Sequence, residues 1–243
     1  MLNHIKQSEY AGYLNLELSI DTSTSFSSIA LSNKGKVIEE LTWDAKRNHS
    51  VELSPAIWSI MDQAKLKPSN LKSVFIAKGP GGFSSLRVGM SFAKAMSLTL
   101  RIPLVSIGTL DIEINPYVPD KMPVFAMIKA SAKSVYSINN LDGGNSVKVM
   151  NVDEIINKTT SQTIFCGEAM SVIGTELVSK LGNLAIVKEY NPPTRKASIL
   201  AALAYEKFME FGGEDIDKLE PVYISGAQYE SATRQMKSKV KNQ

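Results

Sequence analysis

Histidine and cysteine are scarce in this chain of 243 residues, which holds two histidines, His4 and His49, and one cysteine, Cys166. A single cysteine excludes a disulfide within the chain and is typical of proteins in a reducing compartment. A zinc hydrolase needs two histidines one helical turn apart and a third ligand. Leu53 stands four residues after His49, so we expect neither a metal site nor zinc hydrolysis.

Long apolar runs are also missing. No stretch approaches the roughly 18 apolar residues of a membrane-spanning helix, and the opening MLNHIKQSEYAGY lacks the apolar core of a signal peptide. With 44% apolar and 21% charged residues, the composition is that of an ordinary globular protein. We therefore expect a cytoplasmic protein with no membrane contact.

A large excess of charge is absent too. The net charge of +3 does not by itself indicate a nucleic-acid-binding protein. The basic residues gather after Glu230, where no acid occurs among Arg234, Lys237, Lys239 and Lys241. We interpret residues 231–243 as a flexible, solvated tail. The alternative is an arm that contacts RNA phosphates or an acidic partner.

The hydrophobic pattern passes through the same order of elements twice. The first half predicts strands at 14–20, 26–31, 36–41, 73–77 and 104–107 and helices at 49–65 and 84–100. The second half predicts strands at 123–128, 134–138, 146–150, 163–166 and 184–187 and helices at 153–158 and 169–180. Each half thus reads β-β-β-α-β-α-β, which implies a mixed sheet covered by helices. A last helix at 197–211 ends at Gly212-Gly213.

Two such α/β halves resemble the actin-like ATPase (ASKHA) fold, which consists of two duplicated ribonuclease-H-like, mixed-sheet domains. We place the first half at 13–110 and the second at 111–230, and the helix at 197–211 could pack back on the first. Pro55 lies inside the helix at 49–65 and should either kink it or mark its first turn.

In that superfamily the turn after the first strand of each half approaches the nucleotide phosphates. In the first half, IDTSTSFSS places Asp21 at the end of the strand, followed by the hydroxyls of Thr22 and Ser23. The carboxylate could hold magnesium through water while backbone and hydroxyl donors meet a phosphate. The same groups could instead bond their own tight turn.

The second half departs from an acidic nucleotide site. Its turn, MIKASAKSVYS, ends the strand at Lys129, which can neutralise a phosphate but cannot ligate magnesium. The segment FCGEAM offers a single glycine, Gly167, which is more typical of a turn before a helix than of a base pocket. We therefore expect no catalytic residue, no cofactor and at most weak nucleotide binding at a vestigial phosphate site formed by Asp21, Thr22 and Ser23.

The helix predicted within GPGGFSSLRVGMSFAKAMSL, residues 79–98, has two apolar stripes. The first contains Leu86, Gly89, Met90, Ala93, Met96 and Leu100, and the second Val88, Phe92 and Ala95. Apolar faces on two sides imply burial on two sides: one face can pack on the sheet of its own half, and the other requires a second surface. Burial between two domains of the same chain is the alternative to a partner.

The glycine-rich stretch also carries a family resemblance. It resembles the GPGSFTGLRIG signature of the TsaB family, and SIDTSTSFSSIAL, HSVELSPAIWSIM and LEPVYIS occur in the family's order and at its spacing. The resemblance covers most of residues 14–225. It implies an actin-like fold and a noncatalytic paralogue of the transferase TsaD, with which TsaB proteins dimerise.

Several positions depart from the patterns of these families. Lys129 and Ser131 stand where an Asp and an Arg are usual in TsaB proteins. In LVSIGTLDIEI, the region where TsaD-type enzymes carry a metal-binding histidine pair, Ser106, Thr109 and Glu113 are present and histidine is not.

The resemblance implies a noncatalytic dimerisation subunit in the biosynthesis of threonylcarbamoyladenosine, the modified tRNA nucleoside next to the anticodon. The expected partners are a TsaD-like transferase, a TsaE-like ATPase and tRNA through the complex, and a second copy of the chain when it is alone. We predict that the partner interface contains His49, Leu53, Ile57, Leu86, Val88, Gly89, Phe92, Ala95 and Met96. The alternative function is an ATP-dependent transferase or kinase of the actin-like superfamily that uses Asp21.

Overall fold

The computed structural model describes residues 15–119, 121–140, 146–189 and 191–224. These residues form two units, each built around one five-stranded sheet. The first unit takes in the described residues up to Lys78, then 84–107 and 196–221, and the second takes in 79–83, 108–195 and 222–224. The basic tail expected at 231–243 lies outside the described residues.

The sheet of the first unit is mixed, with strand order β3-β2-β1-β4-β5. Its strands are β1 (Leu16–Asp21), β2 (Phe26–Asn33), β3 (Lys36–Asp44), β4 (Leu71–Ala77) and β5 (Leu104–Ile107). The first three pair antiparallel, whereas β1, β4 and β5 run parallel. Lys34 and Gly35 both adopt positive φ, which produces the two-residue turn that matches strand twist between β2 and β3.

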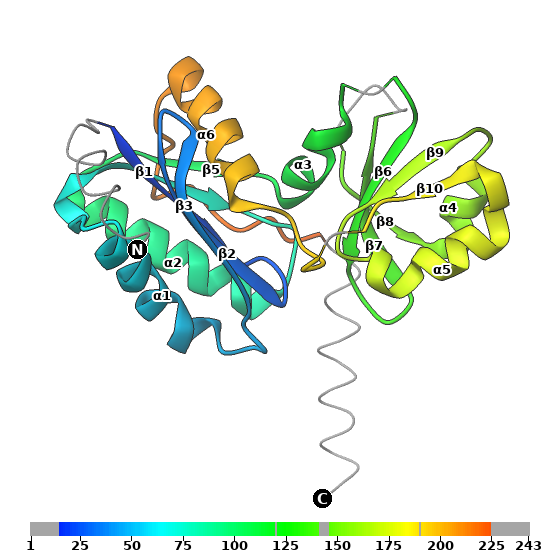
Figure 1. The fold of residues 1–243 in the computed structure, drawn as a ribbon, viewed down its shortest axis with the longest axis horizontal. Coiled ribbons are helices and arrows are strands. Elements are labelled where there is room, and N and C mark those ends of the chain that lie inside the picture. Colours follow the sequence, from blue (N-terminus) through cyan, green and yellow to red (C-terminus); the bar gives the residue numbers. More distant parts are fainter. Residues whose placement is uncertain (1–14, 120, 141–145, 190, 225–243) are drawn as a thin grey trace, which may run out of the picture. The chain divides into compact units, whose positions relative to one another are not determined.

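Three helices cover this sheet (Figure 1). The helices α1 (His49–Gln63) and α2 (Phe83–Leu100) pack on one face, where their apolar side chains join the same core cluster as the strands. The helix α6 (Ala197–Phe211) contacts β1, β2, β3 and β5 from the other face.

Pro55 does not begin or end a helix, because α1 continues through it. Proline lacks the N–H that would bond the carbonyl of Val51. Val51 and Pro55 are both exposed, so water can reach that carbonyl.

The sheet of the second unit repeats this topology, with order β10-β9-β6-β7-β8. Its strands are β6 (Val124–Lys129), β7 (Ser134–Asn139), β8 (Lys148–Asn151), β9 (Thr163–Cys166) and β10 (Ala185–Val187). The helices α4 (Val152–Lys158) and α5 (Met170–Leu181) pack on one face, and α3 (Thr109–Ile114) packs on the other. The predicted order of two β-β-β-α-β-α-β halves is confirmed, and α3 is an addition that the pattern did not predict.

Short 3₁₀ helices complete the architecture at Pro68–Asn70, Asn115–Tyr117 and Gly182–Leu184. No helix within the described residues is both long enough and apolar enough to span a membrane.

Candidate functional site

The turn after β1 is closed by its own hydrogen bonds. Asp21 Oδ1 accepts from the backbone N–H of Ser23 at 2.9 Å and from the Ser23 hydroxyl at 2.6 Å. The hydroxyl of Thr22 donates to the Ser85 carbonyl at 2.7 Å, and His49 Nε2 donates to the Thr24 carbonyl at 2.8 Å. Asp21 and Ser23 thus stabilise their own turn, Thr22 attaches it to α2, and His49 attaches it to α1.

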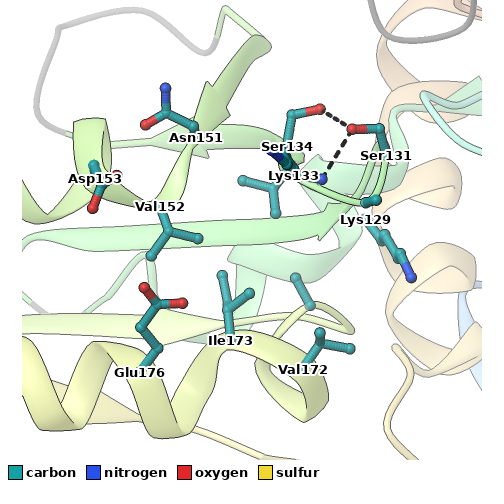
Figure 2. Close-up of a pocket in the computed structure, with 13 residues that line it drawn as sticks. Lys129, Ser131, Lys133, Ser134, Asn151, Val152, Asp153, Val172, Ile173 and Glu176 are labelled. Carbon is teal, nitrogen blue, oxygen red and sulfur yellow. Dashed lines mark hydrogen bonds between the residues drawn. The ribbon is translucent and has the colours of Figure 1, made fainter. Parts of the chain in front are cut away.

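The corresponding turn of the second unit opens into a pocket of about 550 Å³ (Figure 2). The β6–β7 turn contributes Lys129 and Lys133, while Asp153 and Glu176 come from α4 and α5. The hydroxyls of Ser131 and Ser134 lie 2.7 Å apart at its edge. The pocket combines two cations with two acids over an apolar floor, which is not the acid set that would ligate magnesium.

Gly167 serves backbone packing in the second unit. Its φ is +101°, and a Cβ there would overlap the carbonyl oxygen of Met127. The same carbonyl accepts from Ala169 N at 3.1 Å, so the turn into α5 lies directly against β6. This close approach explains the glycine without a nucleotide base.

Cys166 is fully buried beside this turn. Burial, together with the nearby carboxylate of Glu113, raises the pKa of the Cys166 thiol. A thiol held in its neutral form is a poor nucleophile.

A buried ion cluster also lies in the second unit. Arg195 Nη1 lies 3.5 Å from Glu113 Oε1 and 3.6 Å from Glu168 Oε2, and the side chains of Arg195 and Glu113 are 1% and 0% exposed. Thr109 is buried in the same helix as Glu113. Glu113 therefore faces a guanidinium, and the described residues contain no group of three His, Cys, Asp or Glu side chains that could hold a metal ion.

Of the residues predicted for a partner interface, five face the interior of the first unit. They are His49, Leu53, Ile57, Leu86 and Gly89, all of which are buried. Gly89 allows α2 to approach the turn after β1, because a Cβ there would overlap the Thr22 hydroxyl.

The other four predicted residues reach the surface of α2. Val88, Phe92 and Met96 are half-buried and pack against the edge of the core, and Ala95 is exposed. Val88 and Phe92 belong to the stripe that was expected to need a second surface. In the structure both remain partly exposed while they pack against the core.

An open groove of about 500 Å³ runs between α1 and α2. Its lining comes from the N-terminal halves of both helices, namely Ser50, Leu53, Ser54, Arg87, Val88, Ser91 and Phe92. Each helix therefore contributes one wall, and the floor is apolar. A groove of this kind can accept the side chains of another helix.

Sequence reasoning missed three further apolar residues that α1 and α2 expose. Val51 and Trp58 on α1 are 71% and 59% exposed, and Leu98 on α2 is 59% exposed. Val51, Pro55 and Trp58 follow the i, i+4, i+7 spacing of one helical face, so the signal was present in the sequence. We call the groove together with Val51, Trp58, Ala95 and Leu98 the α1–α2 face.

The sequence is similar to that of known protein families. A family model described as TsaD, tRNA N6-adenosine threonylcarbamoyltransferase, matches residues 37–176. The TsaB protein of Bacillus subtilis is 36% identical over 94 residues, which cover 39% of this chain and 41% of that protein. The TsaB protein of Buchnera aphidicola subsp. Acyrthosiphon pisum is 33% identical over 135 residues, or 55% of this chain and 61% of that protein. The chain thus spans about half the length of the curated relatives it matches.

Solved structures agree with the fold. YeaZ from Pseudomonas aeruginosa superposes with a TM-score of 0.69 at 19% identity, covering 86% of this chain and 100% of that chain. At this identity the likeness concerns the fold alone.

Proposed function

Because the chain belongs to the family of the tRNA N6-adenosine threonylcarbamoyltransferase TsaD, and within it to the TsaB proteins, we propose that it is a noncatalytic subunit. This subunit binds a TsaD-like transferase and supports threonylcarbamoyladenosine synthesis in tRNA. Relatives named for tRNA threonylcarbamoyladenosine biosynthesis and for tRNA N6-adenosine threonylcarbamoyl transfer support this proposal. The α1–α2 face is the observation that supports a binding role.

The partner contact uses the α1–α2 face. Apolar surface costs about 25 cal/mol per Å² when water covers it, so Trp58, Val51 and Leu98 favour a covered state. Tryptophan is among the residues that most often act as binding hot spots. The half-buried Phe92 and Val88 supply the apolar floor against which a partner helix packs.

Two further features support a noncatalytic role. Asp21, the acid predicted to hold magnesium at a nucleotide site, accepts hydrogen bonds from Ser23 within its own turn. The matching position of the second unit is Lys129, and an ammonium group has no lone pair with which to ligate magnesium. A TsaE-like ATPase and tRNA would meet this chain through the assembled complex, and a second copy of the chain would cover the α1–α2 face in the absence of TsaD.

Binding of the full chain to a TsaD-type transferase, measured by calorimetry, tests this function. Trp58→Ala removes an exposed ring, so the fold should remain intact while affinity falls by a factor of about 30 or more, which corresponds to about 2 kcal/mol. Phe211→Ala removes another exposed aromatic side chain, from α6, and should bind as the wild type does. Equal affinities for all three proteins would contradict the proposal.

A further inference from the structure

The pocket beside the β6–β7 turn has charged side chains of opposite sign at its two ends (Figure 2). The β6–β7 turn supplies Lys129 and Lys133, which we call the cationic end, and Asp153 and Glu176 form the acidic end opposite Lys129. All four side chains are exposed, and within the described ranges none of their charged groups has an ion-pair or hydrogen-bond partner. The two ends are therefore too far apart to pair with each other.

Apolar side chains lie between the two ends and form an apolar wall. Val152 of α4 and Ile173 of α5 are half-buried there, and Val172 is 66% exposed. Packing within the second unit leaves Val172 uncovered, so a ligand that reached it would remove apolar surface from water. The volume of about 550 Å³ is within the range of small-molecule sites.

The cationic end also holds a hydroxyl donor. Ser131 Oγ and Ser134 Oγ lie 2.7 Å apart, and Ser131 Oγ also accepts from the backbone N–H of Lys133 at 3.2 Å. Whichever hydroxyl accepts the bond between the two serines keeps its own proton for another acceptor. A carboxylate fits this end of the pocket, since it can accept from a hydroxyl and from an ammonium group at the same time.

We propose that this pocket binds an elongated zwitterion, a molecule whose carboxylate and ammonium groups are joined by an apolar chain. The carboxylate meets the cationic end, the ammonium group meets the acidic end, and the chain covers the apolar wall between them. A nucleotide carries phosphates and no cation, so the acidic end would disfavour it. The chemistry of the ligand is shared by a free ω-amino acid and by a peptide that ends in lysine.

Binding of 6-aminohexanoate to the full chain, followed by NMR titration of the backbone amides, tests the pocket. Hexanoate and hexylamine each lack one of the two charged groups, so both should bind about fivefold more weakly or worse. Nα-acetyl-lysine mimics a peptide that ends in lysine, whereas free lysine places an extra ammonium group beside the cationic end. Tighter binding of Nα-acetyl-lysine than of 6-aminohexanoate would support the peptide as the source, and the reverse order would support the free ω-amino acid.

Charge-neutral variants identify the two ends. Lys129→Met should weaken 6-aminohexanoate binding about fivefold and leave hexylamine binding unchanged, because hexylamine has no carboxylate. Glu176→Gln should have the same effect on 6-aminohexanoate and leave hexanoate binding unchanged. Both side chains are exposed, so the fold should remain intact. Lys180→Met, which removes an exposed cation of α5 outside the pocket, is the matched control.

Two results would overturn the proposal directly. One is equal affinity for 6-aminohexanoate, hexanoate and hexylamine, and the other is no change in the amide shifts of the pocket up to about 20 mM 6-aminohexanoate. ATP that binds more tightly than 6-aminohexanoate, and more tightly still to Glu176→Gln, would show a phosphate site instead. These titrations contain no transferase, so their outcome is separate from that of the proposed function.

Discussion

The two units build the same sheet and differ in what surrounds it. In the first unit, α1 and α2 are 15 and 18 residues long and leave a groove between them. In the second unit, α4 and α5 are 7 and 12 residues long. The turn after the first strand is closed by Asp21 and Ser23 in one unit and opens beside Lys129 in the other. The duplicated strands preserve the core, while turns and helices carry the differences between the two units.

The two units also differ in how deeply an internal ion pair is buried. In the first unit Lys207 Nζ meets Glu214 Oε1 at 2.8 Å, with both side chains partly exposed at 32% and 25%. In the second unit Arg195 and Glu113 are almost completely buried. Water screens the first pair and not the second, so the two units should respond very differently when a cation is removed.

Removal of Arg195 should have the largest effect on stability. Arg195→Leu leaves Glu113 buried without its guanidinium, which should lower the free energy of unfolding by about 3–5 kcal/mol. Lys207→Met, the counterpart in the first unit, should cost about 1 kcal/mol or less. Urea unfolding followed by circular dichroism measures both. Similar losses in the two variants would show that burial does not distinguish these pairs.

The next largest difference in stability is expected when a glycine is replaced by alanine in α2 of the first unit and in α5, its counterpart in the second. Gly89→Ala in α2 forces a Cβ against the Thr22 hydroxyl and should destabilise the protein by about 1–3 kcal/mol. Gly174→Ala in α5 meets Val187 Cγ1 at 3.2 Å, and the helix propensity of alanine offsets this by up to about 1 kcal/mol. Thermal unfolding should therefore show a lower Tm for Gly89→Ala than for Gly174→Ala, and the reverse order would contradict the packing described for α2.

The contribution of the Glu214 carboxylate to stability should depend on pH. Burial favours a higher pKa for Glu214, but hydrogen bonds from Lys207 and Ser106 outweigh it and lower the pKa below its ordinary value. A carboxylate with a lowered folded pKa stabilises the protein above its unfolded pKa, and this contribution is lost as pH falls through the folded pKa.

Glu214→Gln should accordingly cost about 0.5–1 kcal/mol at pH 7. The difference from the wild type should shrink below about pH 4, where the unfolded carboxyl group takes up its proton. Urea midpoints measured from pH 7 to pH 3 provide the comparison. A difference that grows toward low pH would have the wrong sign.

The smallest effect is expected on nucleotide binding. The isolated chain should bind ATP weakly and should not hydrolyse it, and Asp21→Ala should leave that weak binding unchanged because Asp21 is engaged with Ser23. Calorimetry and phosphate release measure the two quantities. Tight, magnesium-dependent ATP binding that disappears in Asp21→Ala would instead favour an ATP-dependent transferase or kinase.

Most of the fold could be predicted because strands and long helices have periodic patterns. Alternation predicts β1, and the two-stripe pattern predicts α2 almost to its last residue. The helix α3 was not predicted because TLDIEI spans only six residues and alternates apolar and polar residues as a strand does. Pro55 does not mark the first turn of α1, since the exposed side of a helix tolerates a missing N–H where water can replace it.

The candidate site was less accessible from the sequence. Periodicity identifies two apolar stripes on α2, and Val88 and Phe92 of the second stripe are half-buried in the lining of the groove. Leu53 and Ile57 are as apolar as Trp58, and only the position of the sheet beneath α1 decides which of them is buried. Lys129 and Glu176 line one pocket although they are 47 positions apart in sequence, and no local pattern predicts that they do.

Binding of a TsaD-type transferase to Ala95→Glu tests the role of the α1–α2 face most directly. Ala95 is exposed on α2, so a glutamate there should leave the fold unchanged while it places an unpaired carboxylate in the contact. We expect affinity for the transferase to fall at least tenfold in calorimetry. Ala202→Glu, the same change at an exposed position of α6, should bind as the wild type does. A folded Ala95→Glu chain with wild-type affinity would show that the partner binds elsewhere.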